Sequence, residues 1–129
     1  MRTYGRMQIF SDELPATEIS RRVGIAADRV TVKGEPRRFS GRPENHHAWM
    51  IYSPLPGACG LREHLLWLLR KLDGRCDAVA SLPTECECMF DLWADLERGE
   101  DILEMVLSLD DMRDLVRLKA GIGVSVYVG

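Results

Sequence analysis

The sequence contains no run of about 18 apolar residues, the length that a transmembrane helix requires. Its first residues, MRTYGRMQIF, contain neither the apolar stretch of about 7–15 residues nor the small-residue cleavage site of a secretory signal peptide. We therefore expect a cytoplasmic protein that does not act at a membrane. Thiols stay reduced in the cytoplasm, so the 4 cysteines are not expected to form disulfides.

Motifs that identify common enzyme and metal sites are also missing. The chain has no G-x-S-x-G, no H-E-x-x-H, no C-x-x-C and no glycine-rich phosphate loop followed by Lys-Ser/Thr. A structural zinc site needs roughly four ligands, commonly from cysteine pairs, but Cys59 and Cys76 stand alone. His47, His64 and Cys59 could form a site only if the fold brought them together. We therefore predict no metal, no cofactor and no enzymatic activity.

The length of 129 residues corresponds to one domain, which we assign to residues 1–129. With 46% hydrophobic and 29% charged residues, the composition is that of an ordinary globular protein. A domain of this size buries roughly two-thirds of the surface of its unfolded chain, so it needs no disulfide or metal in order to fold.

Alternation of apolar and polar residues predicts several strands, because successive side chains of a strand point to opposite faces. The predicted strands are residues 3–10, 46–53, 84–93, 102–107 and 122–128, with 29–33 as a further candidate. In the segment 84–93, the inward residues are Cys86, Cys88, Phe90 and Leu92, and the outward residues are Glu85, Glu87, Asp91 and Trp93. Since free cysteine behaves as a small hydrophobic residue, we interpret Cys86 and Cys88 as core residues.

Apolar residues at helical spacing predict helices at 15–23, 61–72 and 108–120. The third has the clearest start, since Ser108 can cap it and Asp111 can complete a capping box. Strands that follow one another directly, with helices between the others, predict an α+β fold. We expect a mostly antiparallel sheet with about three helices packed on one face.

Short stretches spread over nearly the whole chain carry a resemblance to a known family. They are Leu14–Ser20, Val23–Ile25, Lys33–Glu35, Trp49, Leu61–Leu65 and Val126–Tyr127. In these stretches the sequence resembles the bacterial domain-of-unknown-function family numbered 4279. The resemblance implies a small bacterial α+β protein. Because the family has no established catalytic residues, the resemblance implies no site.

Charge is distributed unevenly along the chain. Residues 1–72 hold 12 Lys/Arg and 7 Asp/Glu, whereas residues 73–114 hold 3 Lys/Arg and 13 Asp/Glu. Such an acidic region is either a solvated outer face that keeps the protein soluble or a surface that attracts a basic partner. Trp93, on the same predicted strand face as the carboxylates, would supply the aromatic anchor of an interface. The candidate partner-binding residues are Glu85, Glu87, Asp91, Trp93, Asp95 and Glu104.

We therefore expect a non-catalytic binding protein whose acidic C-terminal half binds a basic protein. An immunity protein that inhibits a toxin, for example a nuclease, fits this size and charge pattern. The oligomeric state does not follow from the sequence.

A second hypothesis places the function in the basic loop of residues 29–42. Arginines in a glycine-containing loop can bind phosphate or carboxylate, so this loop could bind a small anionic ligand or RNA. The candidate anion-binding residues are Arg37, Arg38, Arg42 and His47. Since only Phe39 interleaves the charges, nucleic acid is the less favoured partner. A solvated loop without a ligand is the simplest alternative.

Overall fold

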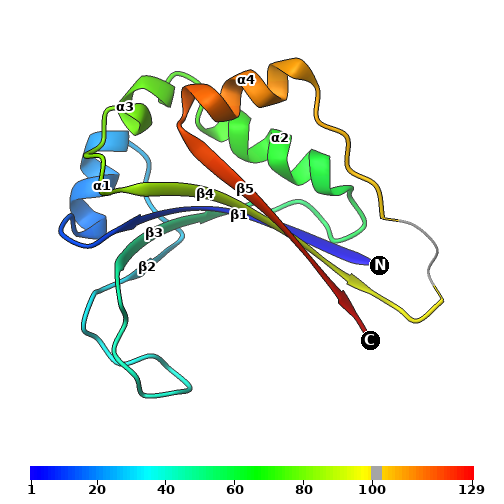
Figure 1. Ribbon diagram of the computed structural model, residues 1–129, viewed down its shortest axis with the longest axis horizontal. Coiled ribbons are helices and arrows are strands. Elements are labelled where there is room, and N and C mark those ends of the chain that lie inside the picture. Colours follow the sequence, from blue (N-terminus) through cyan, green and yellow to red (C-terminus); the bar gives the residue numbers. More distant parts are fainter. Residues whose placement is uncertain (100–102) are drawn as a thin grey trace.

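A five-stranded sheet forms the centre of the fold, with the strand order β2-β3-β1-β4-β5 (Figure 1). The computed structural model describes residues 1–99 and 103–129. The strands are β1 (Arg2–Ser11), β2 (Arg29–Thr31), β3 (His47–Tyr52), β4 (Glu87–Leu96) and β5 (Ala120–Val128). Neighbouring strands are antiparallel except for β4 and β5, which are parallel. The sheet is therefore mostly antiparallel, as predicted.

Four helices in the described part of the chain pack on one face of this sheet (Figure 1). They are α1 (Ala16–Val23), α2 (Leu61–Lys71), α3 (Cys76–Ala80) and α4 (Leu109–Arg117). Helix α2 lies over β1 and β4, and α1 lies against β3. The predicted α+β class is confirmed. The additional helix is α3, which apolar periodicity missed because its 5 residues make little more than one turn.

The core lies between the sheet and the helices. Alternate side chains of β1, β3 and β4 point to the helices and are fully buried, including Met7, Ile9, Trp49, Phe90 and Leu92. The buried apolar residues of the helices include Ile19, Val23, Leu61, Leu65, Leu68, Val79 and Leu115. Trp49 donates its Nε1–H to Ser20 Oγ at 3.0 Å, so its one polar atom is satisfied inside the core.

A close contact between α2 and β1 fixes the position of the longest helix. A Cβ atom on Gly5 would lie 2.8 Å from Cβ of His64, so only glycine allows this approach. His64 is 1% exposed, with Nδ1 2.8 Å from Ser53 Oγ and Nε2 3.0 Å from Thr3 Oγ1. Burial lowers the pKa of His64 below its usual value, which favours the neutral ring. His64 is therefore a structural residue of the core.

The capping box predicted at the start of α4 is present. Ser108 Oγ accepts from the N–H of Asp111 at 3.1 Å, and Asp111 Oδ2 accepts from the N–H of Ser108 at 3.0 Å. Asp111 is 4% exposed and also accepts from Arg62 Nε at 2.8 Å, so it links α4 to α2. Burial alone would raise the pKa of Asp111. The hydrogen bonds from Arg62 and Ser108 outweigh burial and hold the pKa below its usual value.

Two strand predictions need correction. Residues 103–107 form no strand, and Ile102 of the predicted strand lies outside the described residues. Alternate residues of the segment, Leu103, Met105 and Leu107, are still partly buried against the core. The segment runs beside the helical layer toward α4 (Figure 1), and its alternation reflects packing against the core rather than pairing with a strand of the described residues. The strand predicted at 84–93 begins only at Glu87.

Replacing Asp111 by Asn should lower the free energy of unfolding by about 1–3 kcal/mol. The substitution weakens a buried hydrogen bond to a charged partner and half of the capping box together. Chemical denaturation measures the loss. Asp114→Asn is the matched control, because Asp114 is exposed on the same helix, and it should change stability by less than about 0.5 kcal/mol. Equal losses in both variants would contradict this role of Asp111.

The unmodified protein should lose the same contribution in acid. The pKa of Asp111 is lowered in the folded state, so its contribution is complete above the unfolded-state value of 3.8 and disappears as the pH falls through the folded-state pKa. Chemical denaturation at a series of pH values, from neutral downward, measures this loss. The difference in free energy of unfolding between the wild-type protein and Asp111→Asn should shrink as the pH falls.

Cys86 and Cys88 pack against the core as partly buried residues. Burial raises the pKa of Cys88 to about 12. The pKa of Cys59 is also raised, chiefly by its hydrogen bond with Glu63, but less than that of Cys88. Because the thiolate is the reactive form, Cys88 should react more slowly with a thiol reagent than Cys59, at mildly alkaline pH in the native protein. Mass spectrometry of the labelled peptides measures each rate, and the rates should converge in urea. Labelling of Cys88 as fast as that of Cys59 in the native protein would show that Cys88 is not shielded.

Candidate functional site

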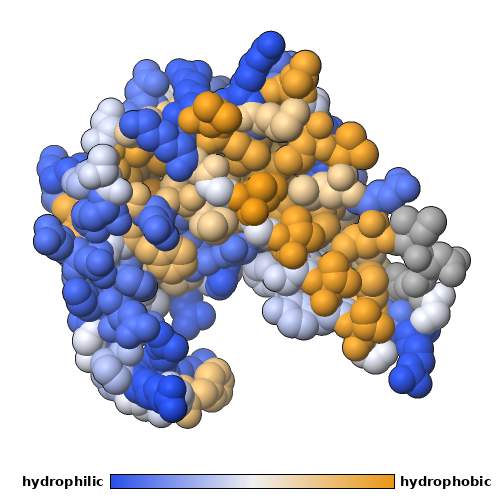
Figure 2. All heavy atoms as spheres, in the orientation of Figure 1, coloured by the Kyte–Doolittle hydropathy of each residue, from blue (hydrophilic) through white to orange (hydrophobic). Residues whose placement is uncertain are grey.

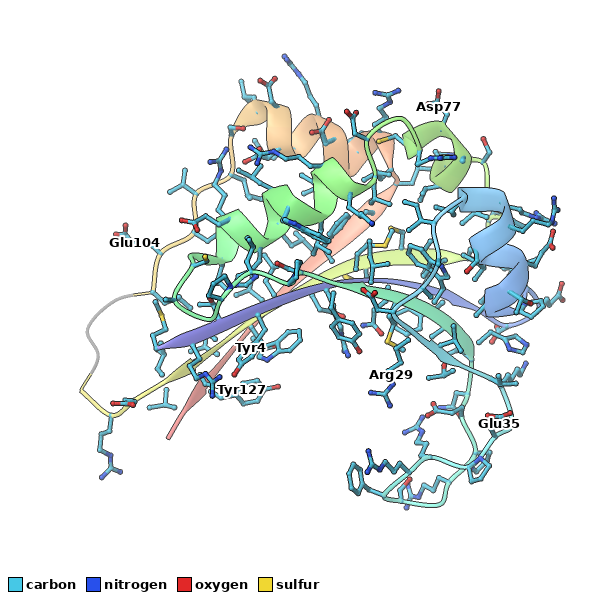
Figure 3. All side chains as sticks on the ribbon, turned by 180° about the vertical axis from the view of Figure 1, so that it is seen from behind. Tyr4, Arg29, Glu35, Asp77, Glu104 and Tyr127 are labelled. Atoms are coloured by element: carbon cyan, nitrogen blue, oxygen red, sulfur yellow. The ribbon has the colours of Figure 1, made fainter. Side chains whose placement is uncertain are left out.

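The face of the sheet that the helices leave uncovered carries most of the predicted partner-binding residues. We call it the open face. Side chains that alternate with the core residues point to it, namely Tyr4, Arg6, Gln8, Phe10, Met50, Glu87, Met89, Asp91, Trp93, Asp95, Ser125 and Tyr127. In Figure 3, the labelled Tyr4 and Tyr127 lie on the side of the sheet opposite the helices. A large partner can therefore reach the exposed side chains of the open face, whereas Gln8 and Met50 are buried among their neighbours.

A long hairpin between β2 and β3, residues 32–46, borders the open face. We call it the arm. Backbone hydrogen bonds join its two sides, from Gly34 N to Glu44 O at 2.9 Å, from Glu44 N to Glu35 O at 2.7 Å and from Arg37 N to Arg42 O at 2.7 Å. The arm projects away from the helices (Figure 1), and the space-filling view shows a hollowed outline between the arm and the end of β5 (Figure 2). The predicted loop of residues 29–42 is thus part strand and part hairpin.

An aromatic pair stands on the open face, where the first part of β1 pairs with the last part of β4. The rings of Tyr4 and Trp93 are stacked with their centroids 5.2 Å apart. The guanidinium carbon of Arg6 lies 5.6 Å from the centroid of the Trp93 ring. Arg6 Nε donates to Asp91 Oδ2 at 3.3 Å, and Gln8 Nε2 donates to the same oxygen. Because each of these side chains is held by a neighbour, the group presents a fixed surface.

Two glycines of β5 leave room beside this group. Gly121 and Gly123 lie opposite Met89 and Asp91 in the pairing of β5 with β4. A Cβ on Gly121 would lie 3.0 Å from Met89 Cε, and a Cβ on Gly123 would lie 3.5 Å from Asp91 Oδ1. The side chains of β4 therefore extend over β5 without obstruction. A hollow of about 220 Å³ opens beside them, lined by Arg6, Asp91, Leu92, Trp93, Ser125 and Tyr127.

The structure separates the six predicted partner-binding residues. Four of them project together from β4 onto the open face and are called the acidic column: Glu87, Asp91, Trp93 and Asp95. Glu85 precedes β4 and accepts hydrogen bonds from Ser11 Oγ at 2.6 Å and from the N–H of Asp12 at 3.0 Å. The bond from Ser11 lowers the pKa of Glu85. Glu104 lies on the segment that leads to α4, on the helix side of the molecule (Figure 3).

The arginines proposed for anion binding in the arm have other contacts. Arg37 Nε lies 3.4 Å from Glu44 Oε2 in an ion pair. The guanidinium carbon of Arg38 lies 5.4 Å from the ring centroid of Phe39, which is 94% exposed in the arm. These two side chains therefore interact with neighbours within the arm.

Arg42 and His47 also have local partners. The N–H of Arg42 donates to Ser40 Oγ at 3.2 Å, and the N–H of Lys33 donates to His47 Nδ1 at 3.2 Å. Both bonds stabilise the arm and its junction with β3. The set of four residues predicted for anion binding does not converge on one site.

A different set of cations does converge. Arg6, Arg29 and Arg37 line a hollow of about 250 Å³ between the arm and the open face, together with Gln8 and His46 among others. Arg6 and Arg37 are each paired with a carboxylate, whereas Arg29 forms no ion pair with another described residue. Figure 3 shows Arg29 pointing away from the helices. Reasoning from the sequence placed Arg29 in the basic loop of residues 29–42 but missed Arg6, because strand pairing brings Arg6 to the arm.

The cluster of His47, His64 and Cys59, which the sequence left open, does not form. His64 is bonded to two hydroxyls beneath α2, whereas His47 is bonded to the backbone at the base of the arm. Residues 1–99 and 103–129 contain no group of three or more His, Cys, Asp or Glu side chains placed to hold a metal ion. Within the same residues, no helix has the length and apolar composition needed to cross a membrane.

Comparison with protein families extends the resemblance seen in the sequence. The family model described as Domain of unknown function (DUF4279) matches residues 2–129, which include every strand and helix of the fold. No curated protein and no solved structure matches the chain. The family number agrees with the one that the sequence stretches indicated, and the match covers the open face together with the helical layer, so the chain belongs to the DUF4279 family.

Proposed function

We propose that the protein is a non-catalytic bacterial binding protein that docks a basic segment of another protein on its open face. The observation that carries the proposal is that the carboxylates of the acidic column flank Trp93, which is stacked on Tyr4 on the open face. A rigid aromatic side chain can bury a large area at low entropic cost, which is why tryptophan and tyrosine dominate the binding energy of many interfaces. Trp93 and Tyr4 are half-buried and stacked, so little of their freedom remains to be lost on binding.

The charges beside the aromatic pair favour a basic partner. Glu87 and Asp95 form no ion pair with another described residue, whereas Asp91 is paired with Arg6. Carboxylates on both sides of Trp93 speed association with a cationic segment and orient it. The ring of Trp93 already lies against the guanidinium of Arg6, and an incoming Arg or Lys can make the same kind of contact with the remaining aromatic surface.

An immunity protein that neutralises a toxin is the form of this function that the charge pattern favours. A toxin that acts on nucleic acid needs a basic surface, because it must bind phosphate groups. The carboxylates of the acidic column could occupy such a surface and block access of the nucleic acid. The 13 Asp/Glu of residues 73–114 would add a favourable long-range field.

Selection of random peptides displayed on phage tests this proposal with a defined probe. Peptides that bind the protein should be enriched in Lys and Arg. Trp93→Ala should weaken the selected peptides by at least about 10-fold, the effect expected for loss of an aromatic anchor. Glu87→Lys should mainly slow their association, and this effect should shrink as salt is added. Kinetics on an immobilised protein surface measure both changes.

Glu104→Lys is the matched control, because it makes the same change of charge on the helix side of the molecule. Peptide affinity for this variant should stay within about 2-fold of the wild-type value, since a distant exposed charge is largely screened. Equal weakening by Glu104→Lys and Glu87→Lys would contradict docking on the open face. Selected peptides without an excess of Lys and Arg would contradict the basic partner.

One observation favours a second candidate function, the binding of a small anionic ligand or RNA. Arg6, Arg29 and Arg37 converge on one hollow, and Arg29 has no carboxylate partner within the described residues. A guanidinium group without an ion pair can bind a phosphate group in bidentate fashion. The candidate anion-binding residues are therefore those that line this hollow. Of the four residues predicted from the sequence, only Arg37 is among them.

A thermal-shift series with inorganic phosphate, nucleotides, sugar phosphates and a short RNA tests this second function. A ligand present at about 100 times its dissociation constant stabilises the fold by about 2.7 kcal/mol. Arg29→Gln should abolish the shift, while Arg38→Gln should preserve it because Arg38 does not line this hollow. If millimolar concentrations of all these compounds leave the melting temperature unchanged, the hollow does not bind anions.

A further inference from the structure

The strand β5 forms an edge of the sheet and lacks the usual protection of an exposed edge. In the part of the chain that the structure describes, β5 pairs only with β4. Its sequence over Ala120–Val128, AGIGVSVYV, contains no charged residue and no proline, and its register with β4 runs without interruption. Soluble monomers normally protect such an edge with charges, proline, a bulge or a very short strand, because unpaired N–H and C=O groups attract another strand.

The opposite edge of the same sheet has that protection. The edge strand β2 is only 3 residues long, and it begins with a charged residue, Arg29. The backbone then leaves the sheet and enters the arm, where Lys33 and Glu35 add further charges. The contrast between the two edges indicates that β5 is adapted to pairing and β2 is not.

The surface next to β5 on the helix side is apolar. Val124, Val126 and Val128 point toward the helical layer but are 47%, 47% and 69% exposed, because no helix of the described residues covers the end of this strand. Helix α4 adds an outward apolar stripe at helical spacing: Leu109 is 68% exposed, Met112 43% and Val116 76%. Figure 2 shows apolar side chains gathered over α4 and β5. A contiguous apolar patch of this kind marks an interaction surface in most soluble proteins.

We propose that β5 pairs with β5 of a second copy of the chain in antiparallel orientation, which joins two sheets into one and covers the apolar patch. An antiparallel pair in one sheet is related by a two-fold axis perpendicular to the sheet, so both helical layers lie on the same side. The α4 helices of the two copies then approach each other above the seam and bury their outward apolar stripes. This dimer goes beyond the proposed binding function and does not depend on it.

The sequence of β5 is complementary to itself, which is why the partner is a second copy. With the axis at Val124, Ile122 lies opposite Val126 and Ala120 lies opposite Val128, so the helix side of the seam is apolar throughout. On the open face, large side chains meet small ones, since Tyr127 lies opposite Gly121 and Ser125 opposite Gly123. Cross-strand pairs of this kind stabilise an antiparallel seam, and no like charges face each other in it.

The charges of α4 also suit a two-fold arrangement. The helix carries Asp110 in its first turn and Arg117 in its last turn, and both are exposed and paired within one copy, with Arg113 and Asp77 respectively. Two helices related by the axis run in opposite directions, so the acidic start of one lies toward the basic end of the other. Opposite charges at both ends of the contact favour this arrangement over a parallel one.

Light scattering during size-exclusion chromatography tests the proposal, with sedimentation velocity as a second measurement. The wild-type protein should have twice the chain mass of 14.6 kDa. Val126→Lys places a charge in the seam and should give a monomer at the same protein concentration. Val116→Lys changes only the outward stripe of α4, leaves the strand intact and should also shift the equilibrium toward the monomer. Circular dichroism establishes that each variant is folded.

Val30→Lys is the matched control, because Val30 is 50% exposed on the other edge strand. This variant should remain a dimer. A monomeric wild-type protein would overturn the proposal. The exposed β5 edge would then be a site for a strand of another protein. A dimer that persists in both folded variants, Val126→Lys and Val116→Lys, would also overturn it, since its interface would then lie elsewhere.

Discussion

The packing of α2 onto β1 determines which face of the sheet is buried and which remains open. The absence of a side chain at Gly5 lets the helix approach until Cβ of His64 lies next to the strand, and the buried imidazole is satisfied by two hydroxyl groups. With α2 in this position, the apolar residues of β1 and β4 that face it leave water. No helix of the described residues covers the other face, so its exposed side chains must be stable in water. Pairs such as Tyr4 with Trp93 and Arg6 with Asp91 meet that requirement.

Much of the fold could be predicted because the relevant signals are local. Alternation along β1 and β4 identifies the side chains that face the core, and the capping box of Ser108 and Asp111 marks the start of α4. The errors concern pairing between distant segments. Residues 103–107 alternate as a strand does, yet no strand receives them. The parallel pairing of β5 with β4 depends on where α4 returns the chain, and no local pattern records that position.

The candidate site could be predicted only in part, because a sequence gives the sign of a charge but not its neighbours. Glu85 is occupied by hydrogen bonds at the end of β1, and Glu104 lies on the helix side, although both belong to the same acidic region of the sequence. Arg29 reaches the hollow beside the arm through the pairing of β2 with β3. One sequence signal did exist: Gly123 lies within the predicted strand 122–128 and Gly121 immediately precedes it, and glycines in a strand often mark a close approach of other groups.

The open face and the β5 edge meet at Tyr127. This residue lines the hollow beside Trp93, and in the proposed dimer it lies opposite Gly121 of the second copy. The ring of one copy would then cover the space that Gly121 leaves beside Met89 of the other, and the two open faces would form one surface. The acidic columns would be separated by three strand spacings, roughly 14 Å, which exceeds the Debye length at physiological salt, so their mutual repulsion is largely screened. A partner with two basic segments could bind both columns at once and gain affinity from the linkage, without any contact that a single copy does not make.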